Sequence, residues 1–264
     1  MTPAWRLIVD GPVAGAENMA RDRAVQLAVE AGEAPPTLRL YRWARPTVTL
    51  GRFQPIEGVD LEAARALGID VVRRFTGGRG VLHDDELTYA VVARTRDGVP
   101  RGVAASYGHL CEPLAEAYRL MGVPAEVTRR DRHASSSSAC YLSTTRADLS
   151  LGALKLSGSA QVWHGATVLQ HGSFTLTRDV EREAAVFRLT ADDAALLAST
   201  AATIFSATGT APEPSSLVPA VVQAFQTSLG VTLEPGEMTA RELERAADLH
   251  AEVSVSVIGQ QADV

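Results

Sequence analysis

Three apolar segments that follow one another closely constrain the fold more than any other feature of the chain. Residues 147–151, 155–163 and 166–176 have the pattern of strands, and Gly152 and Gly165 separate them. Glycine adopts the backbone angles of a tight turn without steric cost. The pattern therefore predicts three strands joined by short turns, and a chain that contains them must build a sheet.

Strand and helix patterns alternate along the N-terminal half. Strands are expected at residues 5–10, where Gly11-Pro12 ends the run, and at 38–43, 47–50, 69–75 and 87–93. Apolar residues at helical spacing predict helices at 15–31 and 106–121. Asp60 can cap a short helix that Gly68 stops.

The C-terminal third is alanine-rich and helical in pattern. Helices are expected near residues 181–187, 190–205, 215–229 and 239–252, followed by a final strand at 253–258. The serine-rich segment 129–138 reads as a mobile loop. Because no long linker divides the chain, we expect one α+β domain over residues 1–264. It would consist of a mixed or antiparallel sheet with packed helices and a helical C-terminal portion.

Composition narrows the class of protein. Hydrophobic residues make up 46% of the chain, enough for a sizeable core, and the net charge of −6 argues against nucleic-acid and anionic-membrane partners. We find neither a signal peptide nor an apolar span. Two cysteines without a Cys-x-x-Cys pair indicate free thiols, so a cytoplasmic protein is expected.

A glycine-rich turn follows the strand at residues 69–75. In Thr76-Gly77-Gly78-Arg79-Gly80, backbone N–H groups could approach an anion or a carbonyl, and the preceding Arg73 and Arg74 could pair with phosphate or carboxylate. The turn is neither a Walker loop nor a GxGxxG followed by a helix. A hairpin with solvated arginines is the alternative.

The two thiols have different surroundings. Cys111 lies in a predicted helix beside its apolar stripe and is expected to be a small buried hydrophobe. Cys140 follows the serine-rich segment, where a thiol has little reason to serve packing. Cys140 is therefore a candidate nucleophile, although an incidental thiol is the alternative.

Lys155 follows Cys140 by fifteen residues, and the residues next to it, 157–160, are all small. A strand lysine normally points to solvent. If it instead meets the thiol, its charge favours the thiolate: a thiol with a pKa near 8.5 is a few per cent ionised at pH 7, and a drop of about 1.5 makes that roughly half. Such a pair suits acyl transfer from a thioester.

The histidines do not have metal-ligand spacing, and we expect no metal site. His171, before Gly172-Ser173, either lines a pocket or simply ends a strand.

These residues together resemble a known family. RRFTGGRGVLHDDELTYAVV and KLSGSAQVWHGATVLQHGSF are similar to motifs of the lipoate-protein ligase and octanoyltransferase branch of the biotin/lipoyl ligase fold. The segments GPVAGAENMARDRA, TLRLYRWARPTVTLGRFQ and GVTLEPGEMTARE also match, so the resemblance covers roughly residues 5–245, with the catalytic core at about 25–240. Within the branch, Ala139-Cys140-Tyr141 and the interval to Lys155 resemble the LipM type of octanoyltransferase.

The resemblance implies that Cys140 carries an octanoyl group as a thioester and that Lys155 lowers the thiol pKa. It implies octanoyl-acyl carrier protein as donor, a lipoyl domain such as that of the glycine-cleavage H protein as acceptor, a monomeric enzyme, and no cofactor. The substrate-binding residues that it implies are Arg74, Thr76, Gly77, Gly78, His83, Ser157, Gly158, His171 and Gly172.

Two departures from the family pattern are visible: TTRADL follows the cysteine region, and Gly80 stands where the family has alanine. The alternatives are an ATP-dependent lipoate–protein ligase, in which Cys140 is incidental, and a non-catalytic binder of acyl carrier or lipoyl domains. An amidotransferase that moves octanoyl between carrier domains is a nearer variant of the transferase.

Overall fold

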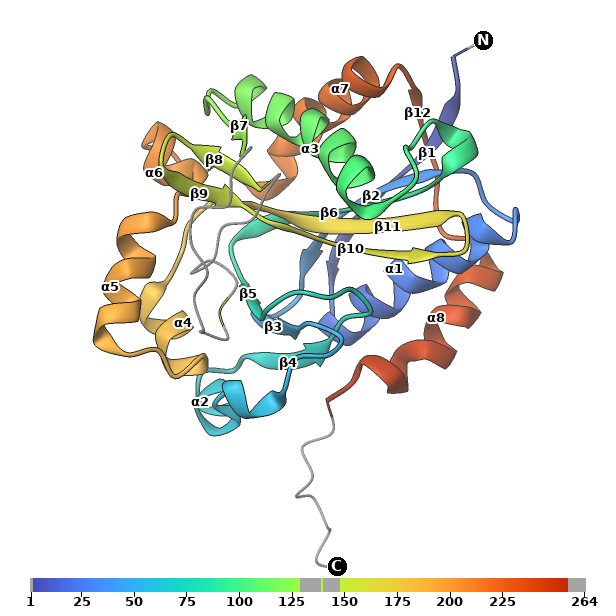
Figure 1. The fold of residues 1–264 in the computed structure, drawn as a ribbon. Helices are drawn as coiled ribbons and strands as arrows, with labels where there is room; N and C mark the ends of the chain where they lie inside the picture. The colour runs from blue at the N-terminus through green and yellow to red at the C-terminus, as the bar shows by residue number, and fades with distance from the viewer. Residues whose placement is uncertain (1, 129–138, 140–147, 256–264) are drawn as a thin grey trace, which may run out of the picture.

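The structure is a computed structural model that describes residues 2–128, 139 and 148–255. It confirms the α+β class, with helices packed on a mixed six-stranded sheet and two three-stranded sheets beside it (Figure 1). The large sheet has the order β10-β11-β6-β2-β1-β12. Its strands are β10 (Ser159–His164), β11 (Thr167–Thr175), β6 (Glu86–Arg94), β2 (Thr37–Trp43), β1 (Ala4–Val13) and β12 (Thr232–Pro235).

The large sheet is antiparallel on one side and parallel on the other. Strands β10, β11, β6 and β2 pair antiparallel in succession, whereas β1 pairs parallel with both β2 and β12. The pairing sets Ser159 opposite Gly172 and His171 opposite Ala90. The site-bearing segment β10–β11 therefore lies next to β6 along its whole length.

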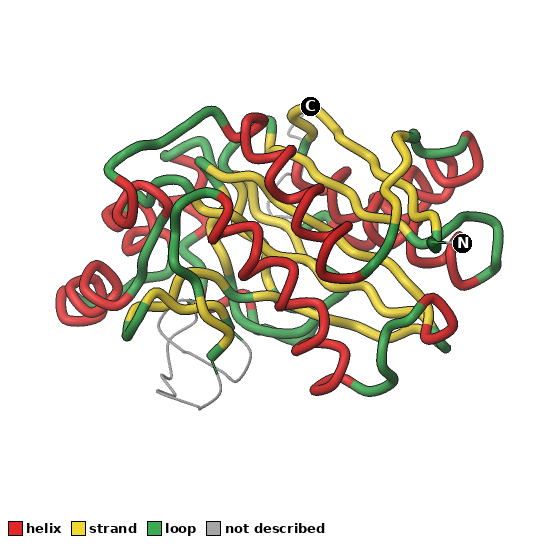
Figure 2. Tube along the Cα trace, turned by 90° about the horizontal axis from the view of Figure 1, so that it is seen from above, coloured by secondary structure: helices red, strands yellow, loops and turns green. Residues whose placement is uncertain are grey.

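Alternation along the strands separates two cores. Leu38 and Leu40 of β2 face one core, which includes α3 (Val103–Leu120) and α7 (Val218–Leu229). Tyr41 and Trp43 face the other core, with α1 (Gly15–Glu30) and α8 (Ala240–Val253). Seen from above, α3 and α7 lie side by side over the strands (Figure 2). Two-sided burial explains why β2 and β6 are almost fully buried.

Two small sheets lie beside the large sheet. One has the order β4-β3-β5, from β4 (Asp70–Arg73), β3 (Thr47–Leu50) and β5 (Val81–His83). The other has the order β7-β8-β9, from β7 (Glu126–Val127), β8 (Leu149–Leu151) and β9 (Leu154–Ser157). The remaining helices are α2 (Leu61–Ala66), α4 (Val180–Val186), α5 (Ala191–Thr200) and α6 (Ile204–Thr208).

Most of the expected elements are present, and the expected caps act as predicted. The carboxylate of Asp60 accepts hydrogen bonds from the N–H groups of Glu62 and Ala63 at the start of α2. Gly68 then follows that helix with φ of 68°. Helices at 15–31 and 106–121 are confirmed as α1 and α3, within three residues at each end.

Other expectations were wrong at particular residues. Gly11-Pro12 does not end β1, because a register shift between Val9 and Pro12 absorbs it. The single strand expected at 155–163 is two strands, β9 and β10, which break at Gly158 and join different sheets. The expected helix at 190–205 is interrupted between α5 and α6.

The C-terminal third is less purely helical than its composition suggests. It contributes β12, which extends the large sheet beside β1. Residue 253 ends α8, and Ser254 forms an isolated bridge with Val72 in place of the start of a strand. The rest of the strand expected at 253–258 and the loop expected at 129–138 lie outside the described residues, apart from Val255.

Candidate active site

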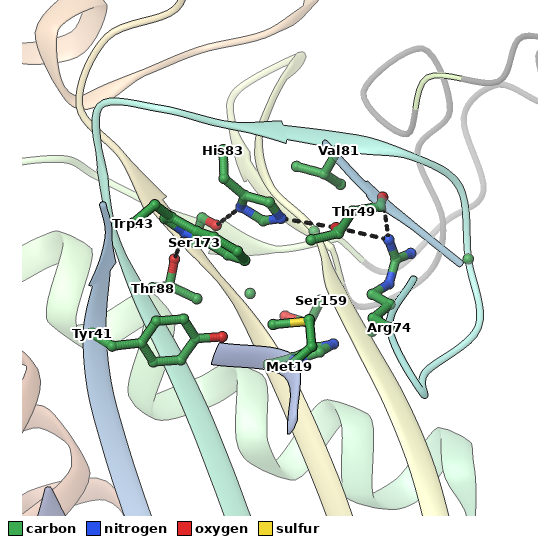
Figure 3. Close-up of a pocket in the computed structure, with 15 residues that line it drawn as sticks. Met19, Tyr41, Trp43, Thr49, Arg74, Val81, His83, Thr88, Ser159 and Ser173 are labelled. Atoms are coloured by element: carbon green, nitrogen blue, oxygen red, sulfur yellow. Dashed lines mark hydrogen bonds between the residues drawn. The ribbon is translucent and has the colours of Figure 1, made fainter. Parts of the chain in front are cut away.

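A pocket opens between the large sheet and the sheet β4-β3-β5. It has about 550 Å³ of atom-free space, including its mouth. Apolar and aromatic groups form part of its wall, and polar groups from Arg74, the glycine-rich turn and strands of both sheets form the rest (Figure 3). Its lining residues are Met19, Tyr41, Trp43, Thr49, Arg74, Gly78, Val81, His83, Thr88, Gly158, Ser159, Ala160, His171, Gly172 and Ser173.

Six of the nine residues expected to bind substrate line this pocket, namely Arg74, Gly78, His83, Gly158, His171 and Gly172. Thr76 contacts the pocket through His171, and Gly77 through Arg74. Ser157 lies behind the wall, where its hydroxyl donates to the carbonyl of Ser173. Tertiary structure thus gathers three sequence motifs around one cavity.

Arg74 holds the glycine-rich turn together. Its guanidinium donates to the carbonyls of Thr49, Gly77 and Arg79 at 2.8–2.9 Å. It also donates to the hydroxyls of Thr76 (3.0 Å) and Thr49 (3.1 Å). Because the side chain of Arg74 is buried, the alternative of a hairpin with solvated arginines does not apply to this residue. Its donors are directed at the protein, and their first role is to shape the turn.

One relay of hydrogen bonds runs from Arg74 to His171. The hydroxyl of Thr76 accepts from Arg74 and lies 2.8 Å from Nε2 of His171. Nδ1 of that ring lies 3.0 Å from a carboxylate oxygen of Asp22, which can only accept, so Nδ1 carries the proton and Nε2 accepts from Thr76. Tyr41 also donates to Asp22, at 3.0 Å. His171 is therefore a pocket residue within β11, not a strand end.

A second relay of the same form runs from Arg74 to His83. The hydroxyl of Thr49 accepts from Arg74 and lies 2.9 Å from Nε2 of His83. Nδ1 of His83 donates to Glu86 over 2.6 Å. Figure 3 shows the His83 ring between Thr49 and Ser173. Trp43 stacks on the imidazole with ring centroids 4.3 Å apart, which fixes the plane of the ring.

The surroundings of His171 and Glu86 determine whether each side chain is charged. Burial lowers the pKa of His171, and Asp22 only partly opposes this, so the ring is neutral at pH 7. Burial by itself would raise the pKa of Glu86, but His83 and the hydroxyls of Ser173 and Thr88 outweigh it and the net pKa is lowered. Glu86 is thus a buried carboxylate stabilised by its hydrogen bonds.

The charge of Asp22 is balanced by Arg39, a buried residue of strand β2. Nη1 of Arg39 lies 2.7 Å from Asp22, and Nε lies 2.7 Å from Asp10. Sequence reasoning missed Asp22 and Glu86. Two arginines, Arg39 and Arg42, interrupt the apolar residues of LRLYRW, and a charge within a strand of this kind was the one available signal that a buried anion lies nearby.

Lys155 is buried and does not point to solvent. Its Nζ lies 3.0 Å from Oδ2 of Asp148, and both side chains are only 3% exposed. Tyr107 donates to Oδ1 of the same carboxylate at 3.1 Å. Asp148 lies in the segment TTRADL, which departs from the family pattern. The atypical segment thus supplies the partner of Lys155.

Small residues let Lys155 reach the pocket wall. A Cβ on Gly158, which lines the pocket, would lie 3.2 Å from Nζ of Lys155. On the facing strand, a Cβ on Gly172 would lie 2.9 Å from the carbonyl oxygen of Gly158. The glycines therefore permit the close approach of β9, β10 and β11 at this point.

Cys140, the proposed nucleophile, lies outside the described residues. The residue before it, Ala139, is fully buried and forms a parallel bridge with Gly80 of the glycine-rich turn. A Cβ on Gly80 would lie 2.5 Å from a ring carbon of Phe187. This contact explains why glycine stands where the family has alanine.

Cys111 is the buried hydrophobe expected from its place in the helix. It is 1% exposed, and burial raises the pKa of its thiol far above the ordinary value. In the described ranges, no group of three or more His, Cys, Asp and Glu side chains could hold a metal ion. Within those ranges we also find no helix whose length and apolarity would suit a bilayer span.

Comparison with known proteins identifies the family of this arrangement. Residues 14–226 match the family model of the lipoyl protein ligase A/B catalytic domain. The chain is 40% identical over 260 residues to octanoyltransferase LipM of Kyrpidia tusciae, with 94% of this chain and 95% of that protein covered. It is 37% identical over 262 residues to octanoyltransferase LipM of Moorella thermoacetica, with 96% of each covered.

Solved structures share the fold. A lipoate-protein ligase A bound with ATP superposes with a TM-score of 0.78 at 22% identity, covering 96% of this chain and 95% of that one. The bipartite lipoate protein ligase of Thermoplasma acidophilum, studied with its E2 lipoyl domain, gives 0.77 at 22% identity, covering 95% and 93%. At this level of identity the likeness concerns the fold.

Proposed function

Because the chain belongs to the lipoyl protein ligase A/B catalytic domain family and matches octanoyltransferases along its length, it is an octanoyltransferase, and we propose that Cys140 carries the acyl group. The observation that supports this role is the buried Lys155–Asp148 ion pair at the pocket wall. A buried ammonium–carboxylate pair is a costly arrangement for packing alone. It is useful where a thiolate must be stabilised.

The proposed reaction has two acyl transfers. In the first, the Cys140 thiol releases its proton and the thiolate attacks the thioester carbonyl of the donor. A C–S bond to Cys140 forms, the C–S bond to the donor breaks, and the donor sulfur takes up the released proton and leaves as a thiol. In the second, the neutral amine of an acceptor lysine attacks the acyl-enzyme. An amide bond forms, the amine loses its proton, and the thiol of Cys140 is restored.

The charges near the pocket suit the first step. Lys155 lowers the pKa of the Cys140 thiol in this mechanism, and Asp148 keeps the buried lysine protonated. Amide formation from a thioester is downhill, so the proposed reaction uses no nucleotide or other cofactor. The backbone bridge between Ala139 and Gly80 ties the residue that precedes Cys140 to the turn that lines the pocket.

The pocket wall suits an apolar acyl chain. Met19, Val81 and the rings of Tyr41 and Trp43 line it, and each buried methylene contributes about 0.8 kcal/mol. Arg74, through Thr76 and Thr49, holds the two histidines in fixed orientations. We propose that Gly77 and Gly78 present backbone N–H groups to the acyl carbonyl, with Gly158 and Gly172 leaving room for the chain.

The family implies an acyl donor and a lipoyl-domain acceptor in general. More specifically, we propose octanoyl-acyl carrier protein as the donor and a lipoyl domain such as that of the glycine-cleavage H protein as the acceptor. The cytoplasmic location and the monomeric state stay predictions.

Intact mass spectrometry tests the proposal. The protein is incubated with octanoyl-acyl carrier protein without ATP, and then with a lipoyl domain. We expect an octanoyl adduct on wild type, none on Cys140→Ala, and transfer to the domain by wild type alone. Formation of an adduct on Cys140→Ala would contradict the proposal that Cys140 is the nucleophile. Lipoylation that depends on ATP and tolerates Cys140→Ala would instead indicate a ligase.

A further inference from the structure

An exposed aromatic residue stands in the loop that packs against the pocket-lining glycine-rich turn. Phe53, in the loop after β3, is 84% exposed, the highest value among the large hydrophobic side chains of the described residues. The guanidinium of Arg52 lies 5.3 Å from the centre of its ring. An exposed arginine–aromatic pair has the composition of a protein–protein hot spot.

The loop that carries this pair is held firmly against the glycine-rich turn. Nη1 of Arg73 donates to the carbonyls of Gly51 and Gln54, each at 2.7 Å. The backbone N–H of Arg52 donates to the carbonyl of Thr76 at 2.8 Å. The exposure of Phe53 therefore belongs to a structured rim and not to a loose chain segment.

The rim touches the pocket directly. Gly51 packs so closely on Gly78, a pocket-lining residue, that a Cβ on Gly51 would lie 1.9 Å from the carbonyl oxygen of Gly78. A molecule that rests on Arg52 and Phe53 thus lies close to the glycine-rich turn that lines the pocket.

The rim is basic although the chain carries a net charge of −6. Within the described residues Arg52 forms no salt bridge, and its positive charge interacts with that of the half-buried Arg23, which Glu252 partly offsets. Residues 51–56 include no acidic side chain. This local charge is complementary to an acidic partner.

The length of the group that carries the reacting atom determines which partner must dock close to the pocket. A lysine side chain extends only about 6 Å from its Cα, so an acceptor domain must place its own backbone at the pocket mouth. A donor whose thioester lies at the end of a flexible prosthetic arm is not held so close.

We propose that Arg52 and Phe53 form the docking surface for an acidic lipoyl domain that presents the acceptor lysine. The proposal rests on the octanoyl transfer proposed above and adds the surface that recognises its protein acceptor. Phe53 would supply apolar contact at the centre, and Arg52 an interaction with a carboxylate of the partner.

Steady-state kinetics of the double variant Arg52→Glu/Phe53→Ser test this surface. We expect KM for an acidic lipoyl domain to rise at least tenfold. The rate at which octanoyl-acyl carrier protein acylates the enzyme should be unchanged. Transfer to hydroxylamine, a small nucleophile that cleaves the thioester to a hydroxamate without docking, should also be unchanged.

A matched control uses residues away from the rim. Phe205 in α6 is 51% exposed, and α6 is well separated from β3 in Figure 1. Arg101 is exposed as well. The variant Arg101→Glu/Phe205→Ser should retain the wild-type KM for the lipoyl domain.

Three results would overturn the docking proposal. They are an unchanged KM for the lipoyl domain, an equal rise in the control variant, and a slower acylation step, which would assign the rim to the donor. Failure of the wild-type enzyme to form any acyl adduct would instead reject the proposed reaction, so the two failures are distinguishable.

Discussion

Nζ of Lys155 and Oδ2 of Asp148 lie 3.0 Å apart in side chains that are each 3% exposed. Lys155 lies in β9, and Asp148 immediately precedes β8, the strand that pairs with β9 in a small sheet beside the pocket. Burial disfavours the charged form of an amine, and a neighbouring carboxylate favours it. Asp148 is therefore a positioning residue for the proposed catalytic lysine.

Asp148→Asn should slow enzyme acylation at least tenfold and move its pH profile to higher pH, because the thiol loses a charged neighbour. Alkylation of Cys140 by iodoacetamide across pH 5–10 measures the change. The substitution should also destabilise the fold by about 3–5 kcal/mol, the cost of breaking a buried pair.

Tyr107→Phe is the control, since it removes the hydrogen bonds of the hydroxyl to Asp148 and to the backbone of Ser159 and leaves the ion pair intact. It should cost about 1–3 kcal/mol and leave the alkylation profile in place. Equal profiles for Asp148→Asn and wild type would contradict the positioning role.

Arg74→Lys should destabilise the protein by about 3 kcal/mol or more and reduce transfer strongly. A single ammonium group cannot replace the fork that contacts both threonines and three carbonyls. Urea unfolding measures the loss. Arg45→Lys, at an exposed site whose arginine donates to Gly68 at 3.3 Å and lies 3.8 Å from Asp70, should change stability by less than about 0.5 kcal/mol. Similar losses in both variants would show that Arg74 has no special role.

Stability should fall as the pH drops below about 6.5, in part through His171. The pKa of His171 is lowered in the folded protein, so the unfolded chain binds a proton first and unfolding becomes more favourable. The contribution of His171 to stability is present at pH values above the pKa of its ring in the unfolded chain. The free energy of unfolding at pH 5.5 and pH 7.5 tests this. His109, whose pKa burial also lowers, contributes in the same direction, so the comparison needs a variant.

His171→Gln should reduce the difference between those two pH values, because one group that resists protonation has been removed. His109→Gln gives the corresponding reference. An unchanged pH dependence in His171→Gln would mean that the ring is not held neutral.

Gly172→Ala should destabilise the protein and impair transfer. Its Cβ would meet the carbonyl of Gly158 at 2.9 Å and the ring of Tyr89 at 3.0 Å, which forces β10 and β11 apart at the pocket. We expect a cost of about 1–3 kcal/mol, measured by thermal unfolding beside an activity assay.

Gly108→Ala is the control for that substitution. Gly108 lies inside α3 with nothing within 4 Å of an added Cβ. Alanine there should stabilise the helix by up to about 1 kcal/mol. A wild-type Tm and activity for Gly172→Ala would show that the strands tolerate a side chain at this contact.

Local patterns predicted a large part of the fold. The helix α1 follows from apolar spacing, and α2 from Asp60 and Gly68, because capping and periodicity act over a few neighbouring residues. The motifs around Arg74, Lys155 and His171 likewise identified the segments that form the pocket. These signals depend on which residues stand near one another in the chain.

The positions at which strands break, and the pairing of strands that are distant in the sequence, could not be predicted from local patterns. Gly158 lies within an apolar run that looks like one strand, and its division follows from the separate sheets that β9 and β10 join. The strand β12 was missed because its one partner, β1, lies more than two hundred residues earlier. Pairing of distant strands depends on contacts that no local pattern contains.

By itself, the sequence determined the α+β class, the family and the fifteen-residue interval between Cys140 and Lys155. Only the tertiary structure decided the partners of the polar residues: Asp148 for Lys155, Asp22 for His171 and Glu86 for His83. The physical reason is burial. A charge withdrawn from water must find an opposite charge or a hydrogen bond in the folded interior, and folding, not sequence distance, brings that partner within 3 Å.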